Sequence, residues 1–166
     1  MRRFAPLLLL LALTGCGLRP LYGGPGGGGV AALLHSVSVA PIEGQSGWLV
    51  RNKLCDRLAD RDDAPATYRL TVTLDDNITA FGIRGDRAAT FERRTLRARY
   101  QLVEASTGAV VLDATAASDA GIDIVSSEYA TVAAEQTALE RLSDQLADQI
   151  VTRLALYASR TSQPQP

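Results

Sequence analysis

The most regular alternation in the sequence is Tyr68-Arg69-Leu70-Thr71-Val72-Thr73-Leu74-Asp75, in which every second residue is apolar. Successive side chains of a strand point to opposite faces, so this stretch predicts a β-strand with one buried and one polar face. Similar alternation from about Thr95 to Glu104, and again from Val110, predicts two more strands. Between these two, Ala105-Ser106-Thr107-Gly108 has the composition of a hairpin turn. One polar face per strand is typical of an antiparallel sheet.

Helical periodicity flanks these strands. A first helix is expected from about Gly47 to Asp60, and Trp48 near its start is expected to be a core residue. A longer helix ends the domain, with Ser127 as its expected N-cap. The apolar stripes of the two helices consist of Val50, Leu54 and Leu58, and of Leu139, Leu142, Leu146, Ile150, Leu154 and Tyr157.

The order of elements predicts the fold class. Val37 and Val39 alternate with serines and indicate a short first strand, which Pro41 ends. The predicted order is β-α-β-β-β-α, an α+β fold with two helices packed on one face of a four-stranded, mostly antiparallel sheet. Residues 33–160 would form this single domain, and residues 161–166 a disordered tail.

The chain begins with the features of a bacterial lipoprotein signal peptide. Met1-Arg2-Arg3 supplies the positive end, and Leu7 to Leu13 is an apolar run too short for a permanent membrane span. Leu13-Thr14-Gly15-Cys16 matches the lipobox, in which the cysteine sulfur receives a diacylglycerol. We therefore expect residues 1–15 to be removed and Cys16 to carry the diacylglycerol and an N-acyl chain.

The next segment, residues 16–32, is rich in glycine and is expected to be a flexible tether between the lipid and the domain. Gly17, rather than aspartate, follows the lipidated cysteine, which in Gram-negative bacteria is typical of transfer to the outer membrane. The expected location is the periplasmic face of the outer membrane.

Composition argues against several classes of function. Without Arg2 and Arg3, 15 basic residues face 18 acidic ones, so the mature chain is mildly acidic and does not resemble a nucleic-acid binder. His35 is the only histidine and is expected to be a surface residue at a strand end. With Cys16 expected to carry lipid, no disulfide is expected, and Cys55 lies beside an apolar helix stripe as a small hydrophobic residue. No catalytic or metal-ligating constellation is apparent, so neither an enzyme nor a cofactor is expected.

Positive charge gathers in one place. The stretch from Phe81 to Tyr100 contains six arginines and only two acidic residues. Arginine pairs bidentately with phosphate and carboxylate groups, so an acidic amphiphile is the expected ligand, with Phe81, Ile83 and Phe91 adding apolar contacts. A solvated edge protected from aggregation is the other interpretation. The candidate site residues are Arg84, Arg87, Arg93, Arg94, Arg97 and Arg99.

Three blocks of residues resemble one family. They are the segment Cys16 to Gly23, the region Gly82-Ile83-Arg84-Gly85-Asp86 with Ala89-Thr90, and Ser126-Ser127-Glu128-Tyr129-Ala130 followed by Ala133-Ala134-Glu135-Gln136, Ala138 and Leu142. With the order of elements, they resemble the LptE family of lipopolysaccharide-assembly lipoproteins, and are most similar to its short α-proteobacterial form.

The resemblance implies a non-enzymatic protein that plugs the LptD β-barrel, assists its folding, and binds lipopolysaccharide. Basic residues on the sheet and its loops make the family's lipid contacts, and the arginines between residues 84 and 99 fit that description. An auxiliary lipoprotein of an ABC-type lipid-trafficking system would also be a tethered α+β domain, and stays open as an alternative.

Overall fold

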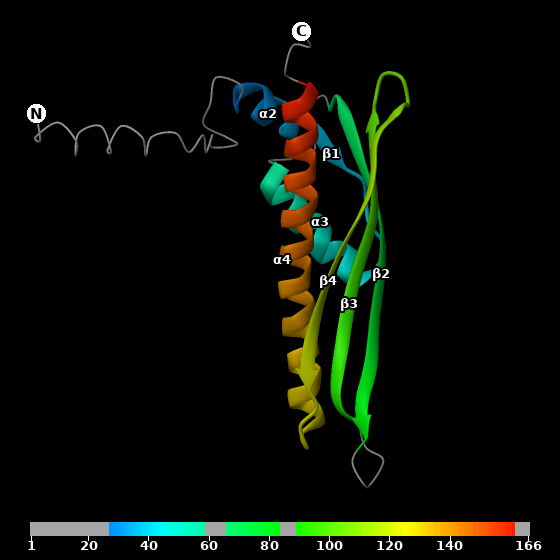
Figure 1. Cartoon of the computed structure of the whole chain (residues 1–166), viewed down its shortest axis with the longest axis vertical. Helices are drawn as coiled ribbons and strands as arrows, with labels where there is room; N and C mark the ends of the chain where they lie inside the picture. Colours follow the sequence, from blue (N-terminus) through cyan, green and yellow to red (C-terminus); the bar gives the residue numbers. More distant parts are fainter. Residues whose placement is uncertain (1–26, 59–65, 84–88, 162–166) are drawn as a thin grey trace, which may run out of the picture.

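The structure is a computed structural model that describes residues 27–58, 66–83 and 89–161. It is an elongated molecule in which a long sheet lies against a long helix (Figure 1). In chain order its elements are α2 (Gly27–Leu34), β1 (Val37–Val39), α3 (Gly44–Leu58), β2 (Tyr68–Ile83), β3 (Ala89–Glu104), β4 (Val110–Asp123) and α4 (Glu128–Thr161).

The four strands form one mixed sheet in the order β1-β2-β3-β4. β1 is parallel to β2 and pairs with only Tyr68–Leu70, whereas the other two pairings are antiparallel and extend over most of each strand. The β3–β4 hairpin closes where the Glu104 amide donates to the Ala109 carbonyl, and Gly108 takes a positive φ of 71°. The turn therefore has its glycine at the position that favours one, as the sequence predicts.

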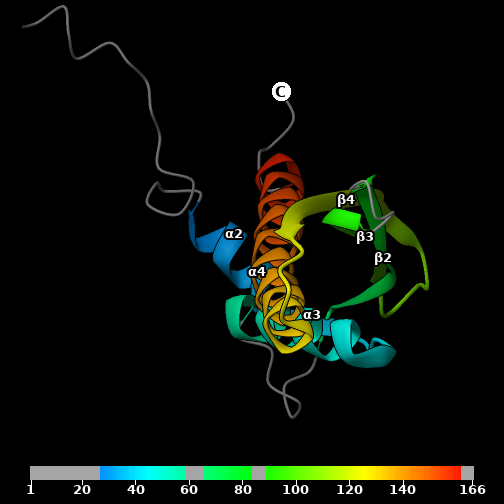
Figure 2. The same cartoon turned by 90° about the horizontal axis from the view of Figure 1, so that it is seen from below.

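The helices gather on one side of the sheet, here called the inner face, and leave the outer face open (Figure 2). β2 and β3 send alternate apolar side chains inward, while α3 and α4 contribute the predicted stripes. The centre of the core consists of Leu70, Leu96, Leu102, Val50, Leu54, Leu58, Leu139, Leu142, Leu146, Ile150 and Leu154.

Helix α4 runs the whole length of the molecule (Figure 1). Its 34 residues span about 51 Å at 1.5 Å per residue. Ser127 caps it as predicted, because its hydroxyl oxygen accepts a hydrogen bond from the Ala130 amide at 3.4 Å. One helix therefore supports both the end of the sheet near β1 and the end near the β2–β3 connection.

The prediction of two helices is wrong, because the described residues contain a third. Helix α2 occupies Gly27–Leu34 and thus the last six residues of the segment 16–32 that was expected to be a tether. Val30 and Leu34 are buried and pack with the core of α4. Burial of these two side chains offsets the helix penalty of about 1 kcal/mol for each glycine, which sequence periodicity could not show. Residues 16–26 and 162–166, including Cys16, lie outside the described residues.

The strands are also longer than predicted. β3 begins at Ala89 rather than near Thr95, and β4 continues to Asp123. Pairing with the neighbouring strand maintains both extensions, and Gly121 is needed there because a Cβ would overlap the Phe91 ring. Trp48 is 63% exposed, so its expected place in the core is wrong: the buried side of α3 starts from Gly47 and Val50.

We expect Gly47→Ala to destabilise the fold. A Cβ on Gly47 would lie 2.7 Å from the carbonyl oxygen of Ile42, and backbone on one side and helix on the other leave little room to relax. The free energy of unfolding, measured by urea denaturation, should fall by about 1–3 kcal/mol. Gly28→Ala is the matched control, since nothing lies within 4 Å of its Cβ position, and it should be neutral or stabilising. Equal effects of the two variants would contradict the packing described here.

Candidate functional site: the outer face of the sheet

The outer face carries most of the described arginines that the sequence predicts as a site. Arg93, Arg97 and Arg99 are exposed along β3, whereas Leu96 and Ala98 between them are buried on the inner face. The predicted alternation is therefore confirmed. Arg84 and Arg87 lie outside the described residues.

Two of these three arginines are paired with aspartates of β4. Arg99 grips Asp113 with two nitrogens, at 2.9 and 3.3 Å, and Gln101 donates to the same carboxylate at 2.9 Å. The hydrogen bonds from Arg99 and Gln101 lower the pKa of Asp113, which therefore stays ionised. Arg93 lies 3.9 Å from Asp119. The positive charge of β3 is in this way offset by its neighbour in the sheet.

Arg97 differs from both. It is exposed, and in the described part of the chain it forms no ion pair within 4 Å, although it lies opposite Asp75 of β2 in the strand register. Its guanidinium can therefore meet an acidic ligand without first leaving a partner. Beside this strand, a shallow hollow of about 210 Å³ is lined by Thr71, Thr73, Arg99 and Gln101.

Arg94 lies on the opposite side of the sheet. Its side chain is only 13% exposed, and two of its nitrogens contact the Asp76 carboxylate at 2.7 and 2.9 Å. A third donates to the Glu135 carbonyl on α4 at 3.0 Å. Because these bonds join β2, β3 and α4, Arg94 stabilises the fold, and the structure does not place it with the outer arginines.

At the far end of the β2–β3 hairpin, aromatic residues join the outer face. Phe81 and Phe91 are directly opposite in the strand register, and the Arg93 guanidinium lies 5.4 Å from the centre of the Phe81 ring. This cation–π contact keeps Arg93 over a half-exposed ring. The apolar contribution expected from the two phenylalanines is present at this end, whereas the side chain of Ile83 is not described.

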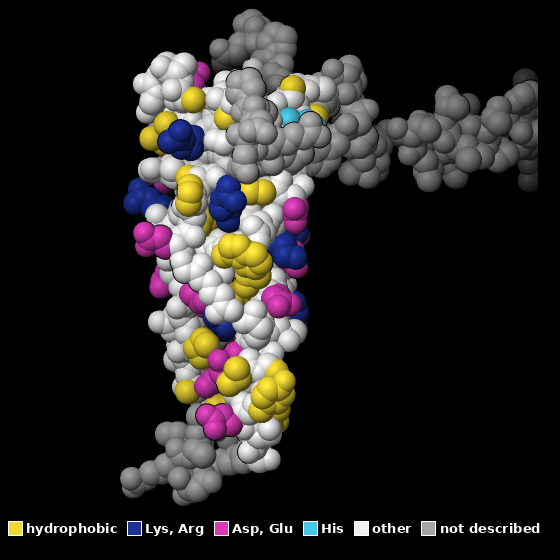
Figure 3. All heavy atoms as spheres, turned by 180° about the vertical axis from the view of Figure 1, so that it is seen from behind, with side chains coloured by type: hydrophobic (Ala, Val, Ile, Leu, Met, Phe, Trp, Pro, Cys, Tyr) yellow, Lys and Arg dark blue, Asp and Glu magenta, His cyan; other side chains and the backbone are white. Residues whose placement is uncertain are grey.

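Further apolar side chains are exposed on the helix side of the same end. They come from β2, from the connection before α4 and from its first turns; Tyr129 is 86% exposed. Figure 3, seen from behind, shows separate hydrophobic patches on the narrow lower half of the molecule. We call the following residues the apolar end: Ile78, Phe81, Val125, Tyr129 and Val132.

Two carboxyl groups meet between β3 and α4. Burial raises the pKa of Glu92, and the neighbouring Glu135 carboxyl raises it further. The Oε2 atom of Glu92 is buried and has no hydrogen-bond partner in the described part of the protein. When both carboxyl groups are ionised, their repulsion destabilises the packing of α4 against β3.

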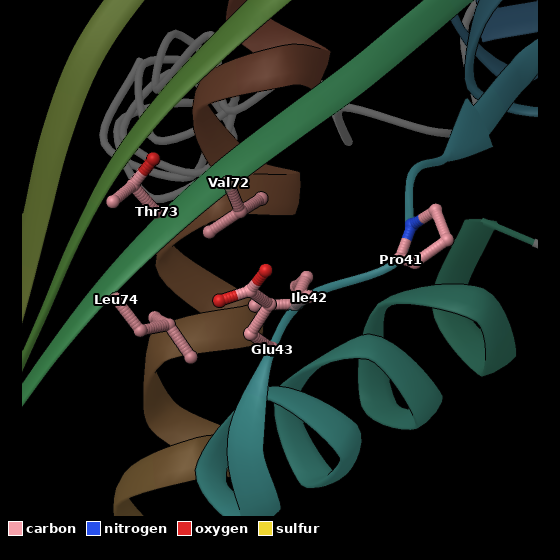
Figure 4. A pocket seen from close by; sticks show the side chains of 6 residues that line it. All are labelled: Pro41, Ile42, Glu43, Val72, Thr73 and Leu74. Carbon is pink, nitrogen blue, oxygen red and sulfur yellow. The ribbon is translucent and has the colours of Figure 1, made fainter.

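The part of the β2 edge that β1 leaves unpaired borders a second hollow. β1 ends at Val39, and the connection through Pro41, Ile42 and Glu43 leaves a space of about 250 Å³ against Val72 to Leu74 (Figure 4). Its lining contains one carboxylate and otherwise apolar or hydroxyl side chains, so it offers no paired acid and base for catalysis.

The described residues give no metal centre. Among them, no three His, Cys, Asp or Glu side chains gather closely enough to hold an ion. His35 is exposed at the turn before β1, as predicted, and Cys55 packs half-buried beside the core. None of the helices in these ranges combines the length and apolarity needed to cross a membrane.

The sequence model of the LptE family, described as lipopolysaccharide-assembly, matches residues 34–154, most of the chain. The chain belongs to the LptE family. The resemblance found in the sequence is thereby confirmed, and a role in lipopolysaccharide assembly follows from membership. A comparison with curated proteins finds no matching sequence.

Solved structures share this LptE architecture. A crystal structure of a protein from Caulobacter crescentus CB15, named as a lipoprotein, is 29% identical, with a TM-score of 0.68 over 80% of this chain and 97% of that one. Rare lipoprotein B from Shewanella oneidensis is 10% identical, with a TM-score of 0.60 over 76% and 98% of the two chains. A minor lipoprotein from Acinetobacter baumannii is 14% identical, with a TM-score of 0.58 over 74% and 92%. The last two show the fold alone.

Sequence reasoning about this LptE protein missed the acidic partners of the arginines. Asp113, Asp119 and Asp123 are all exposed on β4, six and four residues apart. Their even spacing could have placed them on the outer face, but only the paired strands show that Asp113 meets Arg99 and Asp119 meets Arg93.

Replacing Glu92 by Gln should stabilise the protein at neutral pH. A carboxyl whose pKa is raised in the folded state contributes stability at low pH and loses it as the pH rises through that pKa. The neutral amide avoids this loss and can donate to Glu135, so the free energy of unfolding at pH 7 should rise by up to about 1 kcal/mol. The gain should vanish in acid, where Glu92 is protonated; a gain independent of pH would contradict this account.

Proposed function

We propose that the chain is a lipid-anchored, non-enzymatic LptE protein of the outer membrane, which plugs the LptD β-barrel and binds lipopolysaccharide in transit to the cell surface. Membership of the family supports this proposal. The lipobox ending at Cys16 supports an anchor of diacylglycerol and N-acyl lipid that holds the domain on the periplasmic face. No cofactor is part of the proposal.

The observation that carries lipopolysaccharide binding is the open outer face with Arg97 at its centre. Arg97 is the described site arginine without an ion pair to a described residue, and hydroxyl and amide groups surround the neighbouring hollow. Phosphate groups and sugars of a glycolipid need such donors. Arg93 and Arg99 are secondary contacts, because each would have to share its guanidinium with an aspartate. Arg84 and Arg87 remain proposed contacts, whereas Arg94 has its donors occupied.

The apolar end supports insertion into a larger partner. Its side chains are exposed although each is large enough to stabilise a core, and a patch of this kind often marks a protein interface. The end lies opposite α2, which is the described element nearest in sequence to the proposed lipid anchor (Figure 1). We therefore assign the apolar end to the contact with LptD.

Replacing Arg97 by Ala should weaken the binding of lipopolysaccharide. Loss of one unshared charge-assisted contact is expected to raise the Kd about fivefold to tenfold, with a smaller effect in high salt. Binding of the full chain to purified lipopolysaccharide, measured by surface plasmon resonance, is the test. Arg141→Ala is the matched control, since Arg141 is exposed on α4 away from the outer face. Equal affinities of the two variants would defeat the site assignment while leaving the LptD contact open.

The double variant Tyr129→Asp, Val132→Asp should reduce the recovery of LptD. Two charges in a desolvated contact cost several kcal/mol, so co-purification of the barrel with the tagged full chain from outer membranes should drop at least tenfold. Leu156→Asp, at the other end of the same helix, is the control for a new charge. Undiminished recovery, or capture of an inner-membrane transporter instead of a barrel, would overturn the proposed partner.

A further inference from the structure

The free edge of β4 is covered along only part of its length. Gln149 of α4 donates to the Ala117 carbonyl at 3.3 Å, and Ser118 donates to Gln145 one step along. The first bond occupies a backbone group of the edge, and the second joins two side chains where helix and strand touch. Beyond that point β4 diverges from α4 as it approaches the β3–β4 turn (Figure 1), so the edge from Val110 to Thr115 has no strand or helix bonded to it in the described part of the chain.

The pairing pattern shows which backbone groups face this edge. The Tyr68 amide donates to the carbonyl of Ser36, just before β1, and the Leu70 carbonyl accepts from Ala40, just after it. Alternate residues of β2 therefore turn toward β1, and those between them turn toward β3. The same alternation can be followed through the pairing of β2 with β3 and of β3 with β4. In β4, the backbone N–H and C=O groups of even-numbered residues face β3, and those of odd-numbered residues face the free edge. The Ala117 carbonyl, which accepts from Gln149, agrees with this assignment. Asp113 and Thr115 therefore present backbone N–H and C=O groups toward the opening.

A notch of about 470 Å³ lies at the point where strand and helix separate. Ala114 and Ala116 line it from the strand, and their small side chains leave room beside the edge. Gln149 and Arg153 line it from α4. The almost wholly buried ring of Tyr100 also lines the notch and is its aromatic residue.

The helix side of the notch is positively charged. Arg153 is exposed and forms no ion pair with any residue that the structure describes, and Arg160 follows two turns later, also exposed. Burial raises the pKa of Tyr100 while the charge of Arg153 opposes that rise, which indicates that the guanidinium lies close to the phenol. The one carboxylate in the lining, Asp113, is already gripped by Arg99 and Gln101.

We propose that this notch binds an extended acidic peptide segment of a partner protein, which adds to the edge of β4 while one of its carboxylates is held by Arg153. The open backbone groups favour a peptide over a lipid headgroup, because a headgroup cannot use alternating N–H and C=O groups. The unpaired guanidinium favours an acidic segment. The notch is on the helix side of the β4 edge and does not include the outer-face arginines Arg93 and Arg97.

Two fluorescent peptides test the proposal: Ser-Thr-Val-Glu-Val-Thr-Ser, and the same peptide with Gln in place of Glu. With the full chain purified in detergent micelles, fluorescence anisotropy should show the Glu peptide binding roughly tenfold more tightly, the effect of one charge-assisted bond. Arg153→Gln should abolish this preference, whereas Arg141→Gln on the same helix should preserve it. Equal affinities of the two peptides, or a preference that survives Arg153→Gln, would overturn the proposal.

The strand-addition part has its own control. N-methylation of the central Val-Glu-Val of the peptide removes its N–H donors without altering the protein, and should abolish binding. Undiminished binding of the methylated peptide would reduce the site to a simple anion contact and overturn strand addition. A last measurement uses vesicles of phosphatidylcholine mixed with phosphatidylglycerol. If the protein binds these vesicles through Arg153 and binds neither peptide, the notch is a site for lipid phosphate and the proposal is overturned.

Discussion

The packing of α4 on the inner face of the sheet is the interaction on which the rest of the molecule depends. Five large side chains from Leu139 to Leu154 are essentially inaccessible to water, each stabilising the fold by roughly 1.5–3 kcal/mol. The other helices are attached through α4: α2 packs against it, and Arg57 of α3 bonds to Asp144 and Asp148. Burial disfavours the Asp144 carboxylate, but hydrogen bonds from Lys53 and Arg57 outweigh it and lower its pKa. The outer face is open because the three helices of the described ranges are all held on the other side.

Charge on that face is set by pairing between strands more than by composition. Six arginines in one stretch of sequence suggest a strongly basic surface, yet β4 brings aspartates against Arg93 and Arg99, and Arg94 turns inward to Asp76. A sheet with opposite charges on adjacent strands resists both self-association and non-specific attraction of anions. The proposed recognition of an acidic glycolipid would then depend on a few unshared donors.

Much of this arrangement could be predicted from periodicity. The alternation from Tyr68 to Asp75 placed β2 and its faces, and the stripe from Leu139 together with the Ser127 cap placed α4, because these signals are local. Helix α2 could not be predicted, since its glycines favour coil and only contact with α4 stabilises it. The same holds for the ends of β3 and β4 and for the partners of each arginine, which depend on strand register rather than on neighbouring residues.

Helix α2 also limits how far the proposed lipid anchor could lie from the domain. Because residues 27–32 are folded, only residues 17–26 separate Cys16 from the domain, a maximum span of about 35 Å. This maximum span is shorter than the length of α4, about 51 Å. If the proposed anchor is present, the protein would diffuse within a thin layer at the bilayer surface, where its search for a membrane partner is two-dimensional and its local concentration is high. A few helical residues in a glycine-rich segment would thus decide how closely an anchored domain follows the membrane.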